Sequence, residues 1–160
     1  MTLIRPLGPD DLDPVLALNA ANETETSPLT RSELQRLVGI AIYARRVEGA
    51  PAFLLAFDQT AEYFSPNYIW FRERYPRFVY VDRIIVGAEA RGRGLARTLY
   101  LDLIANARSA GHDLVCAEVN SDPPNPGSDA MHASLGFAEV GTAELPDRGK
   151  SVRYLALPLS

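Results

Sequence analysis

A strand–helix–strand pattern over residues 78–119 constrains the fold of this chain more than any other feature of its sequence. Residues 78–86 (FVYVDRIIV) form its strongest predicted strand and residues 93–110 its strongest predicted helix, and a further strand follows at residues 114–119. One face of the predicted helix carries apolar residues at helical spacing, namely Leu95, Leu99, Leu103 and Ala107. Such a βαβ unit predicts two parallel strands joined by a right-handed crossover.

The segments on either side of this unit add further strands and helices. Strands are predicted at residues 3–7, 40–47, 52–57, 137–143 and 151–157, and helices at residues 9–20, 30–38 and 128–135. Thr30 and Glu33 have the spacing of a capping box. Ser128 is placed to cap the last helix, and Gly111 is placed to end the long one. This order of elements predicts a mixed α/β fold, with about four helices on a mixed sheet of about six to seven strands.

The length of 160 residues fits a single domain over residues 1–160, because no repeat, low-complexity tract or flexible linker divides the chain. No apolar run approaches the roughly 20 residues that cross a bilayer. The opening segment MTLIRPLGPDDLD lacks the basic start and the apolar stretch of a signal peptide. We therefore expect a cytoplasmic protein that does not bind a membrane.

Charge and cysteine content exclude several other classes of protein. The formal net charge is −4, so the surface as a whole lacks the basic face that nucleic-acid binding requires. With a single cysteine, Cys116, and two histidines, His112 and His132, we expect neither a disulfide nor a metal site. All 16 basic residues except Lys150 are arginine, and seven of them fall within residues 72–97. This local excess offers the forked donors that suit a phosphate group.

The junction between the strongest strand and the strongest helix reads Arg91-Gly92-Arg93-Gly94. A helix start leaves backbone N–H groups unpaired and carries partial positive charge, so it is suited to binding an anion. The two glycines let the backbone approach a phosphate, and the two arginines add charge. The segment is neither a Walker A loop nor a G-x-G-x-x-G fingerprint. The alternative is a glycine-rich turn that binds no ligand.

Two motifs of this sequence, in the same order along the chain, resemble those of the GCN5-related N-acetyltransferases. Residues 91–96 (RGRGLA) are similar to the family's Q/R-x-x-G-x-G/A signature, and they follow a strand that ends at Val86. Residues 125–137 (NPGSDAMHASLGF) are similar to its N-x-x-A-x-x-L-Y-x-x-x-G-F segment. The resemblance covers residues 78–140 in motif and the first 58 residues in element order only. Neither motif identifies an acceptor.

The resemblance implies that acetyl-CoA is the acetyl donor and that no metal is required. In the family, backbone amides at the helix start hold the pyrophosphate, and the preceding strand pairs with the pantetheine arm, which an asparagine meets from the other side. The family also spreads its two parallel strands to admit the thioester. Carried onto this sequence, the cofactor-binding residues are Ile84, Ile85, Val86, Arg91, Gly92, Arg93, Gly94, Leu95, Ala96, Arg97 and Asn125.

Acetyl transfer requires a neutral amine, whereas an amine with a pKa near 10.4 is almost wholly protonated at pH 7. A carboxylate could remove the proton. Alternation along residues 80–86 places Asp82 on one face with Tyr80, Ile84 and Val86, and this makes it one candidate base. Glu118 on the neighbouring strand is the other, and it matches a base position in some relatives. The alternatives are an ion pair between Asp82 and an arginine, and an exposed or salt-bridged Glu118.

His132 is a candidate acid, because it stands where many relatives have a tyrosine that protonates the departing thiolate. A histidine can act as an acid at neutral pH. The alternative is that His132 only packs or forms a hydrogen bond within the short helix.

Residues 63–80 hold eight of the 14 aromatic residues in the chain. Within residues 59–76, Ser65-Pro66-Asn67 and Pro76 argue against a long helix or a central strand. We expect an acceptor pocket or lid here, with substrate-binding residues Tyr63, Phe64, Tyr68, Trp70 and Tyr80. The alternative is ordinary core packing together with the interface of a homodimer.

These observations predict an acetyl-CoA-dependent N-acetyltransferase that acts on a primary amine of a small molecule or peptide by direct attack in a ternary complex. Two other functions fit the same motifs. One is a CoA-binding module without turnover, such as a sensor or an interaction partner. The other is a nucleotide-binding protein that uses the same helix start for a different diphosphate. The identity of the amine, and the choice of base between Asp82 and Glu118, stay open at this point.

Overall fold

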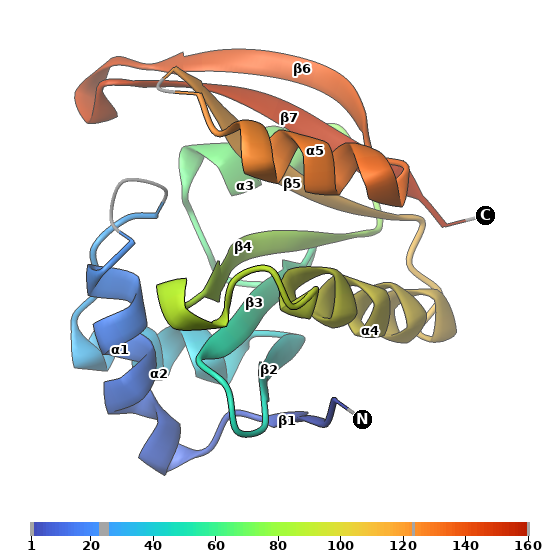
Figure 1. The fold of residues 1–160 in the computed structure, drawn as a ribbon. Coiled ribbons are helices and arrows are strands. Elements are labelled where there is room, and N and C mark those ends of the chain that lie inside the picture. The colour runs from blue at the N-terminus through green and yellow to red at the C-terminus, as the bar shows by residue number, and fades with distance from the viewer. Residues whose placement is uncertain (1, 23–25, 123, 160) are drawn as a thin grey trace.

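The computed structural model describes residues 2–22, 26–122 and 124–159, whose strands form a mixed sheet (Figure 1). The strands lie in the order β1 (Ile4–Pro6), β2 (Tyr43–Val47), β3 (Ala52–Asp58), β4 (Phe78–Val86), β5 (Leu114–Asp122), β7 (Lys150–Pro158) and β6 (Ala138–Leu145). Neighbouring strands are antiparallel, except that β4 and β5 run parallel. The seven strands of the described residues confirm the predicted mixed sheet, and β4 has the bounds predicted from sequence.

Five α-helices accompany the sheet in the described part of the chain: α1 (Leu12–Ala20), α2 (Arg31–Ile40), α3 (Pro66–Arg72), α4 (Leu95–Ser109) and α5 (Pro126–Leu135). Short 3-10 turns lie at η1 (Pro9–Asp11), η2 (Ala88–Ala90) and η3 (Pro146–Arg148). The count exceeds the predicted one because a short helix, α3, forms within the proline-containing segment and begins at Pro66. None of the helices in the described residues is long and apolar enough to cross a membrane.

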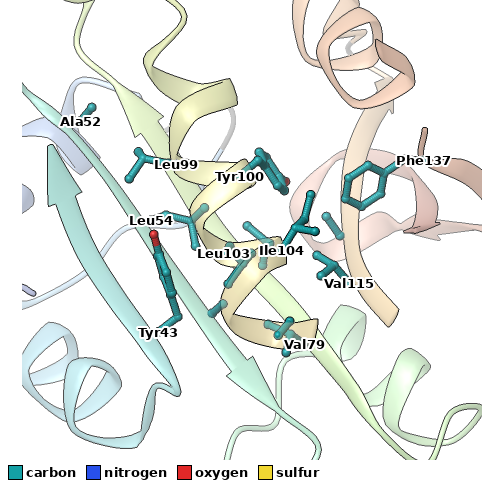
Figure 2. Packing of buried hydrophobic residues seen from close by; sticks show 14 of the residues in the cluster. Tyr43, Ala52, Leu54, Val79, Leu99, Tyr100, Leu103, Ile104, Val115 and Phe137 are labelled. Carbon is teal, nitrogen blue, oxygen red and sulfur yellow. The ribbon is translucent and has the colours of Figure 1, made fainter. Parts of the chain in front are cut away.

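Helix α4 packs its apolar face on the sheet, as predicted. Leu95, Leu99, Leu103 and Ala107 are all buried, and Figure 2 shows α4 lying across the strands that carry Leu54 and Val115. The helix ends at Ser109, and Gly111 two residues later has a φ of 83°, a left-handed conformation that glycine adopts readily. The amides of Gly111 and His112 donate back to the last turn, a Schellman arrangement that ends α4 just before β5.

Helices α1 and α2 pack against the other face of β3. Leu12 and Leu34 from the helices cluster with Phe53 and Leu55, whereas Leu54 belongs to the cluster under α4. The predicted capping box at the start of α2 is confirmed. Thr30 Oγ1 accepts from the amide of Glu33 at 3.1 Å, and Glu33 Oε1 accepts from the amide of Thr30 at 2.9 Å.

The predicted cap of α5 is wrong. Asn125, not Ser128, is the N-cap, and its side-chain oxygen accepts from the amide of Ser128 at 3.3 Å. The helix starts at Pro126 because proline is well suited to the first helical position, where its missing N–H would have no partner.

Side-chain alternation along β4 is interrupted at Asp82. In the register with β3, Arg83 pairs with Leu55 and Val81 pairs with Ala56, so Asp82 is an extra residue in a β-bulge. Beyond the bulge, Ile84 and Val86 pack against the core under α4, whereas Tyr80 packs with residues of α3. The predicted common face for Tyr80, Asp82, Ile84 and Val86 is therefore wrong, because one extra residue reverses the alternation.

Candidate active site

The parallel strands β4 and β5 separate partway along their length. Their pairing ends at Tyr80 with Cys116, although β4 continues to Val86 and β5 to Asp122. A cavity of about 730 Å³ lies where they separate, and it is lined by residues of both strands, of α4 and α5, and of the segment 26–28 ahead of α2. The two strands thus open in the way that the sequence resemblance implies.

Residues at the start of α4 border this cavity. Gly92 and Gly94 have φ of 81° and 71°, and a Cβ at either position would meet no other atom within 4 Å. The left-handed backbone, and not crowding, therefore favours glycine here, and the space around the loop is open. Arg91 and Arg93 are exposed. The guanidinium of Arg91 donates to the side-chain oxygen of Asn22 at 3.0 Å.

The predicted cofactor-binding residues divide into two groups. The cavity is lined by Ile84, Ile85, Val86, Arg91, Ala96 and Asn125. The loop and first turn of α4 beside it contain Gly92, Arg93, Gly94, Leu95 and Arg97, which are not part of the lining. The side chain of Leu95 is buried in the core, so only its backbone is offered to a ligand. Arg97 donates to the Ser134 hydroxyl of α5 at 3.0 Å.

Asp82 lines the cavity with both carboxylate oxygens occupied. Oδ1 accepts from the Tyr63 hydroxyl at 2.5 Å, and Oδ2 accepts from Nε of Arg83 at 2.7 Å. Burial and the Asp82 charge raise the pKa of Tyr63 above its ordinary value, so this hydroxyl stays a donor. The structure therefore contains the ion pair that was the alternative for Asp82.

Arg83 ties this carboxylate to the α1 side of the molecule. Its Nη1 donates to Asn19 Oδ1 at 2.8 Å and to the Ser27 carbonyl at 3.2 Å, and its Nη2 donates to the Ser27 hydroxyl at 3.3 Å. The side chains of Arg83 and Asp82 are only 3% and 4% exposed. A buried ion pair is retained when additional hydrogen bonds satisfy its remaining groups, as they do here.

Glu118 also lines the cavity, but its partners are neutral. The Tyr80 hydroxyl is 2.9 Å from both carboxylate oxygens, and Nδ2 of Asn67 donates to Oε1 at 3.0 Å. Burial and the charge of Asp82 raise the pKa of Glu118 to about 7, although these donors favour its ionised form. Glu118 is thus a carboxylate that can gain or lose a proton near neutral pH.

His132 is buried and forms a pair with Tyr100 of α4. Its Nδ1 lies 2.7 Å from the carbonyl oxygen of Ser128, and its Nε2 lies 2.6 Å from the Tyr100 hydroxyl. Because a carbonyl only accepts, Nδ1 carries the hydrogen and Nε2 accepts from Tyr100. Burial lowers the pKa of His132 and raises that of Tyr100, so both rings are neutral at pH 7. Both residues line the cavity.

The aromatic residues predicted to bind substrate lie in different parts of the structure. Tyr63 and Tyr80 line the cavity. Tyr68 is buried in the core, where its hydroxyl donates to the Asp58 carbonyl at 2.6 Å. Phe64 is 68% exposed, and Trp70 stacks on Tyr154 with ring centroids 4.3 Å apart. Tyr68, Phe64 and Trp70 lie outside the cavity lining, so packing accounts for most of this aromatic segment.

Three polar residues at or next to the cavity were not identified from the sequence. Asn67 and Tyr100 line it, and Tyr154 donates its hydroxyl to Asn67 Oδ1 at 2.8 Å. Tyr100 directly follows Leu99 on the predicted apolar side of the helix, and Asn67 interrupts an aromatic run. Neither position indicates which side chain it will meet.

Cys116 is a buried thiol, and the described residues contain no cluster of side chains that could hold a metal ion. Cys116 is 0% exposed, and burial raises the pKa of its thiol well above the ordinary value. Within residues 2–22, 26–122 and 124–159, no three His, Cys, Asp or Glu side chains gather in a way that could hold a metal ion.

Solved structures with this fold include several acetyltransferases. The ribosomal-protein-S18-alanine N-acetyltransferase of Escherichia coli is 20% identical, with a TM-score of 0.73 over 100% of this chain and 95% of that chain. NAA60 of Arabidopsis thaliana, solved with a bisubstrate analogue, is 15% identical, with a TM-score of 0.77 over 99% and 98%. The yncA protein of Salmonella typhimurium, solved with its cofactor acetyl-CoA, is 17% identical, with a TM-score of 0.75 over 100% and 95%. At these identities the likeness establishes the fold.

The sequence itself identifies the family. No curated protein matches the chain. A family model described as the acetyltransferase (GNAT) family matches residues 19–137, a range that includes β4, the start of α4 and α5. This match covers more than half of the chain and contains both motifs found in the sequence. The chain therefore belongs to the GNAT family of acetyltransferases.

Proposed function

We propose that this protein transfers the acetyl group of acetyl-CoA to a primary amine of a small molecule or peptide, by direct attack in a ternary complex, with Glu118 as the general base. The observation that carries the proposal is the Glu118 carboxylate, which lines the cavity between β4 and β5 and whose pKa is raised to about 7. A base is most effective when its pKa lies near the working pH. Membership of the family supports the reaction class.

The residues around the cavity between β4 and β5 are suited to binding acetyl-CoA. From Ile84 to Val86, β4 pairs with β3 on one side, and no strand of the described residues pairs with its other edge, which can therefore pair with the amides of a pantetheine arm. We assign this edge and Asn125 to the arm. The open loop, the unpaired amides at the start of α4 and the arginine charges suit a pyrophosphate, which we assign to residues 91–97.

Bound acetyl-CoA supplies a thioester carbonyl that an amine can attack and a thiolate that can leave. The protein must supply the amine in its neutral form, which costs about 4–5 kcal/mol for an ordinary alkyl amine at pH 7. Glu118 accepts this proton, directly or through one water. Asp82 is the weaker candidate, because the guanidinium of Arg83 holds it in a buried ion pair, whereas the donors to Glu118 are neutral. We assign to Asp82 the role of fixing Tyr63 and Arg83 in the cavity wall.

We assign the acid role predicted for His132 to the pair that it forms with Tyr100. The one hydrogen on the His132 ring is held by the Ser128 carbonyl, whereas the Tyr100 hydroxyl donates to Nε2. To protonate the thiolate, the Tyr100 hydroxyl must release Nε2 and turn its hydrogen toward the sulfur. We propose that it does so, that His132 orients it beforehand, and that water returns a proton to the phenolate before the next turnover. Tyr100→Phe and His132→Leu should each lower kcat for acceptors whose turnover is limited by thiolate release. A loss confined to His132→Leu would contradict the assignment to Tyr100.

Cys116 supports direct transfer over a covalent acetyl-enzyme. Nucleophilic cysteines react as thiolates, whereas the buried Cys116 thiol stays protonated because burial and the nearby Glu118 raise its pKa.

Two measurements test the proposal. Calorimetry should detect binding of acetyl-CoA and CoA but not of ATP or NAD, and stronger binding of ATP would contradict the choice of donor. Release of the CoA thiol should then occur with at least one member of a panel of amines, amino acids and peptides. Tight CoA binding without release across the whole panel would identify a CoA-binding module instead.

A matched pair of glycine variants tests the site of binding. Gly92 and Gly49 have φ of 81° and 78°, and neither crowds a neighbour, so Gly92→Ala and Gly49→Ala introduce similar backbone strain. Gly49 lies in the turn between β2 and β3, outside the cavity lining. Both variants should lose about 1–2 kcal/mol of stability, but only Gly92→Ala should weaken binding of acetyl-CoA. Equal affinity in the two variants would contradict the assignment of the pyrophosphate to this loop.

A further inference from the structure

Two polar side chains from separate elements donate to the Glu118 carboxylate, and a third donates to one of them. Tyr154 of β7 donates its hydroxyl to Asn67 Oδ1 at 2.8 Å, and Asn67 of α3 donates Nδ2 to Glu118 Oε1 at 3.0 Å. Tyr80 of β4 donates to the same carboxylate at 2.9 Å. Tyr154 is also the residue that pairs with Glu118 in the register of β7 with β5. The carboxylate is thus contacted from β4 and α3, and β7 reaches it through Asn67.

The chemistry of each group fixes the direction of these hydrogen bonds. An ionised carboxylate only accepts, so Asn67 must turn its NH2 group toward Glu118. The amide oxygen of Asn67 then faces Tyr154 and takes the hydrogen of its hydroxyl. Among the side chains of residues 2–22, 26–122 and 124–159, Asn67 and Tyr80 donate to Oε1 of Glu118, whereas Tyr80 alone donates to Oε2. Oε2 therefore keeps the larger capacity for a further partner.

We propose that Asn67 and Tyr154 are positioning residues for acetyl transfer: they hold Oε1 of Glu118 so that Oε2 is the atom presented to the acceptor amine. Tyr154 acts through Asn67, because its hydroxyl decides which end of the amide faces the carboxylate. This inference rests on the proposed function, since it takes Glu118 as the base.

Packing around Trp70 holds the chain of hydrogen bonds in place. Trp70 follows Asn67 by one turn of α3 and stacks on Tyr154, with centroids 4.3 Å apart and planes inclined by 22°. Gly141 of β6 leaves room for this ring, because a Cβ there would lie 2.4 Å from Cζ2 of Trp70. Asn67 and Tyr154 are buried at 3% and 1% exposure, so water does not compete for their hydrogen bonds.

The other titratable groups near Glu118 should not change the pH dependence of kcat/KM near pH 7. They are Asp82 and Tyr80 on β4, Tyr63 ahead of α3, Tyr100 on α4, Tyr154 on β7 and Cys116 on β5. Burial raises the pKa of each of these tyrosines and of the cysteine, so they are neutral near pH 7. Asp82 carries charge, but its bonds to Tyr63 and Arg83 do not involve Asn67 or Tyr154.

The test is the pH profile of kcat/KM for Asn67→Leu and Tyr154→Phe. The acidic limb of this profile is the rise of kcat/KM with pH as Glu118 ionises. Loss of the Asn67 donor disfavours ionised Glu118, so this limb should move to higher pH by about one unit. Tyr154→Phe keeps the amide but not its orientation and should move the limb by about half a unit. Both variants should lose more activity at pH 6 than at pH 8, with an unchanged KM for acetyl-CoA.

Tyr43→Phe is the matched control. It also removes a buried tyrosine hydroxyl from a carboxylate, that of Asp102 at 2.7 Å, but Tyr43 and Asp102 lie outside the cavity lining. Its acidic limb should coincide with that of the parent protein. A limb that moves equally in Tyr43→Phe and Tyr154→Phe would reduce the effect to general destabilisation and overturn the inference.

The outcomes separate this inference from the proposed function. If Glu118→Gln removes the acidic limb while Asn67→Leu and Tyr154→Phe leave it in place, the base assignment stands and the positioning role is wrong. If Glu118→Gln keeps full activity, both the base assignment and the positioning role are wrong. Should Asn67→Leu fail to fold, the pH profile of Tyr154→Phe still tests the positioning role, because this variant keeps the ring that stacks on Trp70. An NMR titration of the Glu118 carboxyl gives the same answer without turnover, and a parental pKa in folded Tyr154→Phe protein overturns the inference.

Discussion

The two carboxylates that share the cavity have different kinds of neighbours. Asp82 meets the guanidinium of Arg83 and one hydroxyl, and Arg83 ties it to Asn19 and Ser27. Glu118 meets two neutral donors, and the charge of Asp82 together with burial raises its pKa to about 7. The first environment neutralises a charge and fixes it, while the second leaves a group that exchanges a proton near neutral pH. From these partners we assign a structural role to Asp82 and the proposed reactive role to Glu118.

The largest expected effect is on turnover. Glu118→Gln should lower kcat about 100- to 1000-fold, because it removes the group that accepts the proton of the amine. Asp82→Asn should cost less, since Asp82 is held in a buried ion pair with Arg83. Initial rates of thiol release measure both, and calorimetry should find acetyl-CoA binding to Glu118→Gln as tight as to the parent. A greater loss in Asp82→Asn than in Glu118→Gln would reverse the assignment of the base.

The next effect is on stability at the other carboxylate. Arg83→Met leaves Asp82 as a buried carboxylate without its cation and should lower the free energy of unfolding by about 3–5 kcal/mol. The double variant Asp82→Asn with Arg83→Met removes the uncompensated charge and should recover part of that loss. Urea unfolding at pH 7 measures both proteins. Parental stability in Arg83→Met would show that the ion pair does not hold this side of the cavity.

Features that depend on neighbours in sequence could be predicted from sequence. The bounds of β4, the apolar face of α4 and the capping box at Thr30 rest on periodicity and cap chemistry within a few residues. The bulge at Asp82 could not be predicted, because it depends on the register of β4 with β3. The cap at Asn125 was missed for a local reason, namely that Pro126 can open the helix.

The candidate site shows the same limit more strongly. His132 was identified as a candidate because it lies in a motif that resembles one of the family's, and Glu118 because it lies on the strand just before that motif. Their partners were not, because Asn67 is 51 residues from Glu118 and 87 residues from Tyr154. Tyr100 likewise meets His132 across 32 residues. These contacts arise only when α3, β7 and α4 pack, so the environment that sets the pKa of Glu118 is not encoded in any short segment.

The same comparison predicts a dependence of stability on pH. The pKa of Glu118 is raised from 4.5 to about 7, so the folded protein binds this proton more tightly than the unfolded chain does. That contribution is present below pH 4.5 and is lost as the pH rises through 7. Glu118→Gln should therefore be more stable than the parent by about 1–3 kcal/mol at pH 8, with a smaller difference at pH 5. Urea unfolding at the two pH values measures this, and a constant difference would contradict it.

The smallest expected effect links the two carboxylates directly. Asp82→Asn removes a negative charge that disfavours ionised Glu118, so the pKa of Glu118 should fall and the acidic limb of kcat/KM should move to lower pH by about half a unit. Rates measured between pH 5 and pH 9 can resolve this shift, and a limb that moves upward would show that Asp82 does not act on Glu118 through its charge. The shift is opposite in sign to the one expected for Asn67→Leu. Opposite shifts from these two neighbours would mean that the reactive carboxylate is tuned by a balance, in which one fixed charge raises its pKa and neutral donors lower it.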